Sequence, residues 1–155
     1  MTRVRVSIVD VYVLRQTASQ LEILALRRGP GTRSTGAWES VHGHIEEAES
    51  PVEAARRELL EETGFTPLGL YNLSRVESFY QHRVDEVALI PVFVALVDPA
   101  GDVLLSAEHD GWDWLSLPQA GSRFAWPRER RALADIQALL GSGGAGALED
   151  VLRIG

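Results

Sequence analysis

The sequence contains no cysteine, and this absence excludes several kinds of site at once. A chain without thiols cannot build a disulfide framework, a thiolate zinc site or a cysteine nucleophile. The lack of cysteine is compatible with the reducing cytoplasm. We therefore expect a cytoplasmic protein.

Long apolar runs are also missing from the sequence. The longest run, residues 87–97, has the length of a strand and is interrupted by Pro91, whereas a membrane-spanning helix needs ~20 apolar residues. The first apolar stretch, residues 4–14, is interrupted by Arg5 and Asp10, and no small-residue cleavage site follows it. We expect no membrane partner and no signal peptide.

Positive charge is scarce as well, because 15 Lys and Arg stand against 22 Asp and Glu, for a net charge of −7. A nucleic-acid-binding protein needs a basic face to neutralise phosphates, so we expect no nucleic-acid partner. A small phosphate ester can still bind an acidic protein if divalent metal ions mediate the contact. The positions of the carboxylates are therefore the informative feature.

What the 155 residues do contain is the pattern of one α/β domain. Alternating and β-branched residues predict strands at 4–14, 21–26, 38–41, 68–73, 76–80, 87–97 and 112–115. Ser50, Pro51 and Glu53 form a helix start signal, and Gly64 is a stop signal. A second helix is predicted over residues 127–140. Because few helices lie between the strands, we expect a mixed β-sheet in an α/β/α sandwich.

The two ends of the chain differ in their predicted order. We expect a single domain over residues 1–140. The segment that follows begins with GSGGAGA at positions 141–147, a composition typical of flexible segments. Residues 141–155 are therefore predicted to form a flexible glycine-rich tail.

Three carboxylates gather on one side of the first predicted helix. At 100° per residue, Glu58, Glu61 and Glu62 fall within an arc of about 100° in the last two turns. Like charges at this spacing repel by a few tenths of a kcal/mol per pair, and acids near a helix C-terminus oppose the macrodipole by roughly 0.3–1 kcal/mol each. A bound Mg²⁺ or Mn²⁺ reverses both effects. A solvated helix face, with Arg57 paired to Glu61 or Glu53, explains the same pattern, and helix geometry alone does not separate the two interpretations.

The spacing of the segment GHIEEAESPVEAARRELLEETGF, residues 43–65, separates them. This segment resembles the sequence box of the Nudix hydrolase superfamily at every defining position of that box. The matching positions are Gly43, Glu49, Arg57, Glu58, Leu59, Glu61, Glu62, Gly64 and Phe65. The resemblance implies the Nudix fold and a loop and helix that bind Mg²⁺ or Mn²⁺.

The resemblance also implies a role for each matching residue. Glu61 and Glu62 are the expected chief metal ligands, and Glu58 is either a further ligand or the base that activates water. We expect Glu58 and Glu61 to be the catalytic pair. Arg57 is expected to orient the carboxylates by pairing with Glu49. Gly43 is expected to be structural, and the carbonyl of His42 is a further candidate metal ligand.

Many members of the superfamily use one more glutamate from outside the box. Glu108, just before the strand with Trp112 and Trp114, is the favoured candidate in this chain, and Glu86 is its rival. A surface acid without a role is the alternative for both.

The regions that flank the box indicate a branch of the superfamily. The stretches W-E-S-V-H-G-H-I-E-E, residues 38–47, and E-H-D-G-W-D-W-L, residues 108–115, resemble the bacterial dihydroneopterin triphosphate pyrophosphatases, which also hydrolyse dATP. The chain departs from common family patterns at Ala48, where glycine is usual, and at His42, where a small residue is usual.

Candidate substrate contacts follow from residue type. A flat heterocycle needs an aromatic face, for which we favour Trp38 and Tyr80, with Phe79 and Trp126 as further candidates and Gln81 and His82 as polar partners. Arginine suits bidentate phosphate contacts, and we favour Arg27 over its neighbours Arg28 and Arg33. Each aromatic residue has a purely structural alternative in the core.

The expected function is Mg²⁺-dependent hydrolysis of a pyrophosphate linkage in a nucleoside or pterin triphosphate, releasing a monophosphate and pyrophosphate. An alternative is hydrolysis of another nucleoside diphosphate derivative, such as an oxidised dNTP, a nucleotide sugar or a dinucleotide polyphosphate. A third possibility is a non-catalytic nucleotide sensor. The expected partner is a small nucleotide-like molecule, and the chain is expected to be a monomer or a homodimer.

Overall fold

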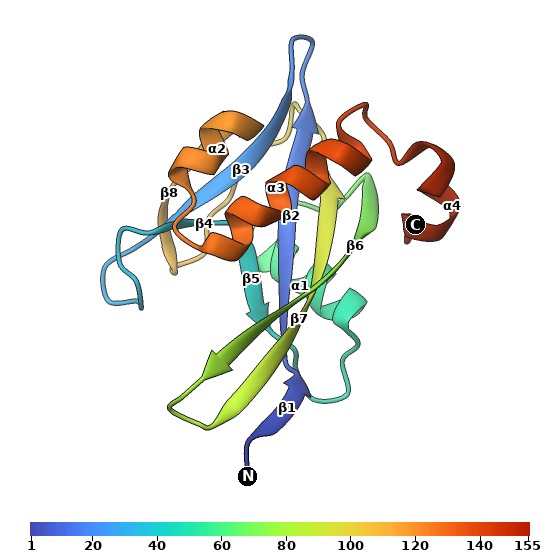
Figure 1. Cartoon of the computed structure of the whole chain (residues 1–155). Coiled ribbons are helices and arrows are strands. Elements are labelled where there is room, and N and C mark those ends of the chain that lie inside the picture. The colour runs from blue at the N-terminus through green and yellow to red at the C-terminus, as the bar shows by residue number, and fades with distance from the viewer.

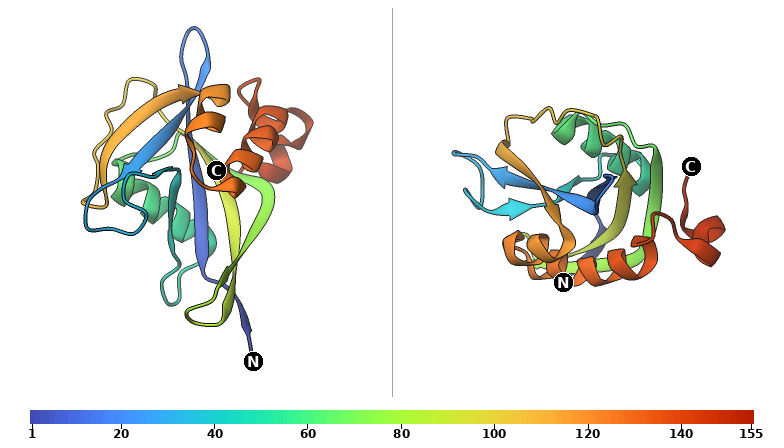
Figure 2. Two further views of the ribbon diagram at one scale, coloured as in Figure 1. Left: turned by 60° about the vertical axis from the view of Figure 1, so that its left-hand side comes forward. Right: turned by 90° about the horizontal axis from the view of Figure 1, so that it is seen from above.

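The computed structural model describes residues 1–155 and shows one eight-stranded sheet with helices on both of its faces (Figures 1 and 2). None of the helices combines the length and the hydrophobicity that a membrane-spanning segment requires. The strands are β1 (Arg3–Val6), β2 (Ile8–Gln16), β3 (Leu21–Arg28), β4 (Trp38–Glu39), β5 (Val41–His44), β6 (Gly69–Gln81), β7 (Glu86–Leu96) and β8 (His109–Ser116). The helices are α1 (Pro51–Thr63), α2 (Leu117–Arg123), α3 (Pro127–Leu140), the 3₁₀ turn η1 (Gly146–Leu148) and α4 (Glu149–Leu152).

The sheet is mixed, as the sequence predicts. Strand β7 pairs in parallel with β1 and β2 and antiparallel with β6. Strand β2 pairs antiparallel with β3 and β5, and β3 pairs antiparallel with β4 and β8. Strands β4 and β5 thus carry the chain from one part of the sheet into α1 (Figure 1).

Alternation along β2 divides the core into two layers. Val9, Val11 and Val13 join the cluster that includes the buried face of α1, whereas Tyr12 and Leu14 join the cluster that includes α2 and α3. Successive side chains of a strand point to opposite faces, so an almost wholly apolar β2 supplies both layers at once. The predicted α/β/α sandwich is confirmed.

Helix α1 begins and ends where its capping residues predict. The Ser50 hydroxyl accepts a hydrogen bond from Glu53 N, and the Glu53 carboxylate accepts one from Ser50 N at 2.7 Å. Gly64 ends the helix at φ 78°, a left-handed conformation that glycine adopts without steric cost. Ala54, Ala55 and Leu59 pack against the sheet, so the opposite side of the helix is left for polar side chains.

The structure differs from the predicted elements in four places. The strand expected at residues 38–41 is divided between β4, which pairs with β3, and β5, which pairs with β2. The strand expected at residues 4–14 is two strands, β1 and β2, which pair with different stretches of β7. The two strands expected at 68–73 and 76–80 are one strand, β6, with an irregularity between Asn72 and Val76 where Ser74 has φ 60°. Helix α2 was not predicted, although Ser116 and Gln119 form a capping box at its start.

The segment after residue 140 contains η1 and α4, and its last residues fold back against β6. Ile154 N donates to Leu70 O at 2.7 Å, and Tyr71 Oη donates to a Glu149 carboxylate oxygen at 2.6 Å. Leu152 is buried beside the core. The division into a domain over 1–140 and a flexible tail over 141–155 stays a prediction.

Candidate active site

The loop and helix from Gly43 to Gly64 bring β5 against α1 at very short range. A Cβ atom on Gly43 would lie 2.1 Å from Glu58 Cδ, so any other residue at this position would displace the Glu58 carboxylate. Glu58 is buried. Burial raises its pKa above the ordinary value, against the opposing effect of Arg57. Gly43 therefore makes room for this carboxylate, and its structural role stays a prediction.

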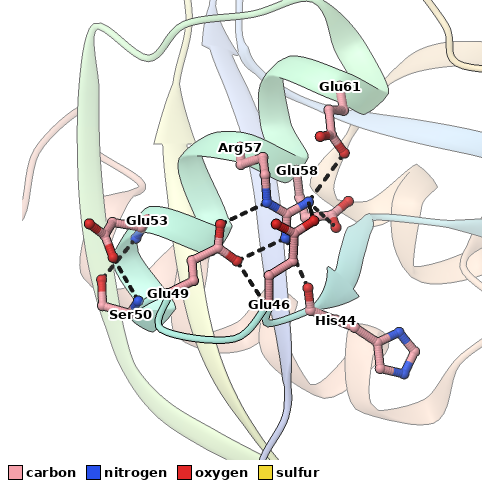
Figure 3. A network of polar contacts seen from close by, with 8 residues as sticks. All are labelled: His44, Glu46, Glu49, Ser50, Glu53, Arg57, Glu58 and Glu61. Carbon is pink, nitrogen blue, oxygen red and sulfur yellow. Dashed lines mark hydrogen bonds and ion pairs between the residues drawn. The ribbon is translucent and has the colours of Figure 1, made fainter.

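Arg57 lies at the centre of the acidic cluster (Figure 3). It donates to both Glu49 carboxylate oxygens, at 2.7 and 2.9 Å, and to Glu58 at 2.9 Å and Glu61 at 3.2 Å. It also donates to the backbone oxygen of His44 at 2.9 Å. The bonds from Arg57 lower the pKa of Glu49 to about 2. The arginine thereby ties the loop to the helix and sets the orientation of three carboxylates.

The donor set of this cluster fits a hard divalent cation. Arg57 is the one cationic side chain within 4.0 Å of Glu49, Glu58 and Glu61, so the cluster keeps a surplus of negative charge. The Glu61 side chain remains 56% exposed. Mg²⁺ and Mn²⁺ prefer such carboxylate oxygens. The residues present therefore suit the ion that the sequence predicts.

A second acidic group lies directly behind this cluster. Glu62, Glu108 and His109 each offer a ligand atom, and these atoms lie within 4.8 Å of one another. Burial raises the pKa of Glu62 to about 7, although contact with His109 opposes this shift. Burial lowers the pKa of His109, but Glu39 and Glu62 outweigh that effect and bring it to about 9. His109 was not predicted to join the site, because no histidine spacing in the sequence indicates it.

A cleft of about 550 Å³ opens over these residues. It brings together six residues that the sequence predicts for the site: Glu58, Glu61, Glu108, His42, Gly43 and Arg57. Glu49 reaches the cluster through Arg57, and Glu62 through its closeness to Glu108. The rival acid, Glu86, instead pairs with Arg5 at 3.4 Å and does not line the cleft.

The three favoured substrate contacts do not line the cleft. Arg27 pairs with Asp110 at 2.7 Å, Trp38 packs beside the core under Arg123, and the Tyr80 hydroxyl donates to Asp85 at 2.9 Å. Their neighbours in the sequence line the cleft instead: Arg28, Glu39, Phe79 and Gln81.

Strand geometry explains this shift by one residue. Adjacent residues of a strand face opposite sides, and residue type alone does not indicate the side. A bulge in β8 lies opposite these two residues, because Arg27 is paired with Gly111 and Arg28 with His109. The extra residue, Asp110, lies between these two pairs.

The lining of the cleft also includes an aromatic pair. Phe79 and Trp126 pack edge to face with ring centroids 6.0 Å apart, and Ile8 and Ile90 lie in the same lining. Arg128 lies 5.0 Å from the Trp126 ring centroid and donates to the buried Asp10 at 2.8 Å. Phe79 and Trp126 were further candidates from the sequence, whereas Arg128 was missed because only the α3–β2 contact brings it to the cleft.

A family model for the NUDIX domain matches residues 2–136 of this chain. Together with the fold and the acidic loop and helix, this match shows the class of protein. The chain belongs to the Nudix hydrolase superfamily, enzymes that hydrolyse acid anhydride linkages in nucleotide-like substrates.

Individual relatives span several activities. A Myxococcus xanthus octanoyltransferase is 34% identical over 123 residues, which are 74% of this chain but only 32% of that protein. The asymmetrical bis(5'-nucleosyl)-tetraphosphatase of Mus musculus is 31% identical over 104 residues, covering 66% of this chain and 69% of the relative. This chain therefore spans about a third of the length of the first relative and about two thirds of the second.

Two solved structures show the same fold. A C. elegans Ap4A hydrolase complex has a TM-score of 0.73 at 24% identity, covering 87% of this chain and 97% of that one. The E. coli dihydroneopterin triphosphate pyrophosphohydrolase has a TM-score of 0.69 at 23% identity, covering 86% of this chain and 95% of that one. At such identities the likeness concerns the fold, and it favours neither substrate.

Proposed function

We propose that this protein hydrolyses a pyrophosphate linkage in a nucleoside or pterin triphosphate, with Mg²⁺ or Mn²⁺ as cofactor, and releases a monophosphate and pyrophosphate. The observation that carries the proposal is the composition of the cleft. Its lining holds Glu58, Glu61 and Glu108 together with the aromatic pair of Phe79 and Trp126. Carboxylates that can bind a metal ion and one aromatic pair in the same cleft suit a molecule with one flat ring and one polyphosphate chain.

The carboxylates of the site can provide both metal ligands and a base. We propose Glu61, Glu62 and Glu108, with the carbonyl of His42, as the ligand set, and Glu58 as the base or a further ligand. A bound divalent ion polarises the phosphoryl oxygens and lowers the pKa of a water molecule. Glu58 is suited to receive the proton of that water, because burial raises its pKa toward the working pH.

Two arginines that line the cleft are suited to contact the phosphates of the substrate. Arg28 and Arg33 line the cleft, and the Arg28 side chain donates to the backbone oxygen of Arg33. This bond joins the tip of the loop over residues 29–37 to the end of β3. We propose Arg28 and Arg33, in place of Arg27, as the phosphate contacts, since the guanidinium group matches phosphate oxygens in bidentate fashion.

A second candidate substrate is a dinucleoside polyphosphate. The mouse relative that supports it is named as an asymmetrical bis(5'-nucleosyl)-tetraphosphatase and matches two thirds of this chain. Such a substrate has two bases, and the cleft has one aromatic pair in its lining. For this reason we place the triphosphate first.

One assay separates these possibilities. The protein is incubated with Mg²⁺ and a panel of nucleoside and pterin triphosphates, nucleotide sugars and dinucleoside polyphosphates, and the products are identified by chromatography. We expect a monophosphate and pyrophosphate from a triphosphate. Faster release of a mono- and a triphosphate from a dinucleoside tetraphosphate would move the proposal to the second candidate.

The metal assignment has its own variant. Glu61→Gln combined with Glu62→Gln should abolish turnover, since it removes two proposed ligands, and full turnover in this variant would contradict the ligand set. Tight nucleotide binding by the unaltered chain with no turnover of any panel member would instead indicate a nucleotide sensor.

A further inference from the structure

His109 lies buried between two carboxylates from different elements. Its side chain is 1% exposed, its Nδ1 lies 2.9 Å from Glu62 Oε2 of α1, and its Nε2 lies 3.6 Å from Glu39 Oε2 of β4. Each ring nitrogen therefore faces a carboxylate oxygen. These contacts are ion pairs rather than well-aligned hydrogen bonds, because neither satisfies hydrogen-bond geometry. The imidazole is the physical link between the helix and the floor of the cleft.

Two successive residues at the start of β8, Glu108 and His109, take different positions. His109 is paired with Arg28 at the start of β8, and its side chain points into the protein. Glu108 precedes the strand, is exposed and lines the cleft. Glu108 is thus accessible from the cleft, whereas the adjacent His109 is buried.

Glu62 depends on this histidine for its charge balance. Its side chain is 5% exposed, and His109 is its one basic partner within 4.0 Å. A ligand atom of Glu108, a second acid, lies within 4.8 Å of it. A buried carboxylate without a partner is strongly unfavourable. Without His109, Glu62 would lose its one basic partner and would be free to rotate away from the position in which it offers an oxygen to a metal ion.

Glu39 extends the link to the cleft itself. Its side chain is 1% exposed, lies 3.3 Å from His42 Nδ1 and 3.5 Å from Arg28 Nη1, and lines the cleft. Glu39 therefore holds the second nitrogen of His109 while its other contacts reach two further cleft residues. The chain of contacts runs from α1 through β8 to β4 without a break.

On the basis of the proposed function, we propose that His109 and Glu39 are positioning residues that hold the Glu62 carboxylate in place for the divalent cation. Neither residue acts on the substrate. Partners of this kind orient metal ligands in many proteins, and their loss typically lowers metal affinity by about 10- to 100-fold. His109 is placed behind the ligand set because Nδ1 already faces Glu62 and the ring is buried.

Mn²⁺ binding to the metal-free protein, followed by electron paramagnetic resonance, tests the proposal directly. We expect His109→Gln to weaken Mn²⁺ binding by about 10- to 100-fold, to lower kcat and to leave the KM for substrate almost unchanged. Glu39→Gln, which keeps the shape but removes the charge, should weaken Mn²⁺ binding in the same direction and serves if His109→Gln does not fold. His82→Gln, in the exposed turn after β6, is the matched control and should bind Mn²⁺ as the unaltered chain does.

A double variant isolates the route of the effect. If His109 acts through Glu62, then Glu62→Gln with His109→Gln should bind Mn²⁺ no more weakly than Glu62→Gln alone. Additive losses would overturn the proposal, and so would unchanged Mn²⁺ affinity in a folded His109 variant. Nitrogen hyperfine coupling from His109 to bound Mn²⁺ would also overturn it, by making His109 a ligand. Failure of the unaltered chain to bind Mn²⁺ would instead reject the proposed function.

Discussion

At the scale of single residues, the geometry of the site depends on Gly43 having no side chain. Gly43 has no Cβ, and the Glu58 carboxylate occupies the space where one would lie. The obstructing group is the end of a flexible side chain, so the protein can accommodate a larger residue by moving that carboxylate. Folding and catalysis are therefore separable at this position.

We predict that Gly43→Ala lowers kcat by about 100-fold or more while the melting temperature changes little, because a displacement of ~1 Å in a catalytic group can cost this much. Steady-state kinetics and thermal unfolding measure the two effects. Gly121→Ala is the matched control, since its added Cβ would meet Leu133 Cδ1 at an ordinary 3.7 Å. Loss of stability in parallel with activity would show that Gly43 serves the fold rather than the carboxylate.

A second residue-scale effect concerns Glu129, which is fully buried and accepts a hydrogen bond from Ser40 N. Burial raises its pKa from 4.5 to about 8. The folded protein therefore keeps this acid protonated at pH values at which the unfolded chain ionises. The unfolded state binds fewer protons in this window, so stability falls as the pH rises from the unfolded to the folded pKa.

We predict that Glu129→Gln becomes more stable relative to the unaltered chain as the pH rises from 4.5 to about 8, by at most ~1.4 kcal/mol per pH unit. Urea unfolding at several pH values gives the difference between the two proteins. Glu47→Gln, at an exposed position, controls for the loss of one negative charge. A constant difference across this pH range would mean that Glu129 ionises in the folded protein.

At the scale of elements, strand alternation decides which aromatic residue of β6 lines the cleft. Phe79 and Tyr80 are adjacent in β6 and both are partly exposed, yet only Phe79 lines the cleft and contacts Trp126. Tyr80 pairs with Asp85 across the β6–β7 turn. The β6–β7 hairpin thus directs one aromatic side chain into the cleft and the next one toward Asp85.

We predict that Phe79→Ala raises the KM for the preferred triphosphate by about tenfold, the equivalent of ~1.4 kcal/mol of lost stacking, with little change in kcat. Tyr80→Ala should leave KM almost unchanged and is the natural comparison on the same strand. Initial-rate kinetics on both variants measure the effect. A larger increase in KM for Tyr80→Ala would place the substrate on the other side of the hairpin.

At the scale of the whole molecule, the cleft and the C-terminal segment are independent. No residue after Arg128 lines the cleft, whereas Leu152 and Ile154 cover β6.

The net charge of −7 opposes the approach of an anionic substrate, so arginines and divalent ions at the cleft must compensate locally.

We predict that a chain ending at Leu140 still folds and keeps its kcat, but melts about 5–15 °C lower, because it loses burial worth ~2–4 kcal/mol at β6. Circular dichroism melting and the hydrolysis assay measure both properties. A truncated chain that does not fold would show that the domain extends beyond residue 140.

The sequence alone identifies α1, its capping residues and the acidic box, and these are the features that carry the reaction class. They are predictable because each depends on residues within about two turns of one another, through capping hydrogen bonds and helical periodicity. The contact of Arg57 with Glu61 follows from the same helical spacing, whereas its pairing with Glu49 was implied by the family resemblance.

Only the tertiary structure decides what surrounds that helix. Glu62 meets His109, and Arg128 meets Asp10, across long stretches of chain, and such contacts depend on strand register. The extra residue of β8, Asp110, shifts the register between Arg27 and Arg28 by one, which places His109 rather than Asp110 opposite Arg28. A one-residue change of register reverses the face of every side chain beyond it. The loop that begins at Gly43 and helix α1 were therefore evident from the sequence. The long-range partners of this site, such as His109 and Arg128, were not.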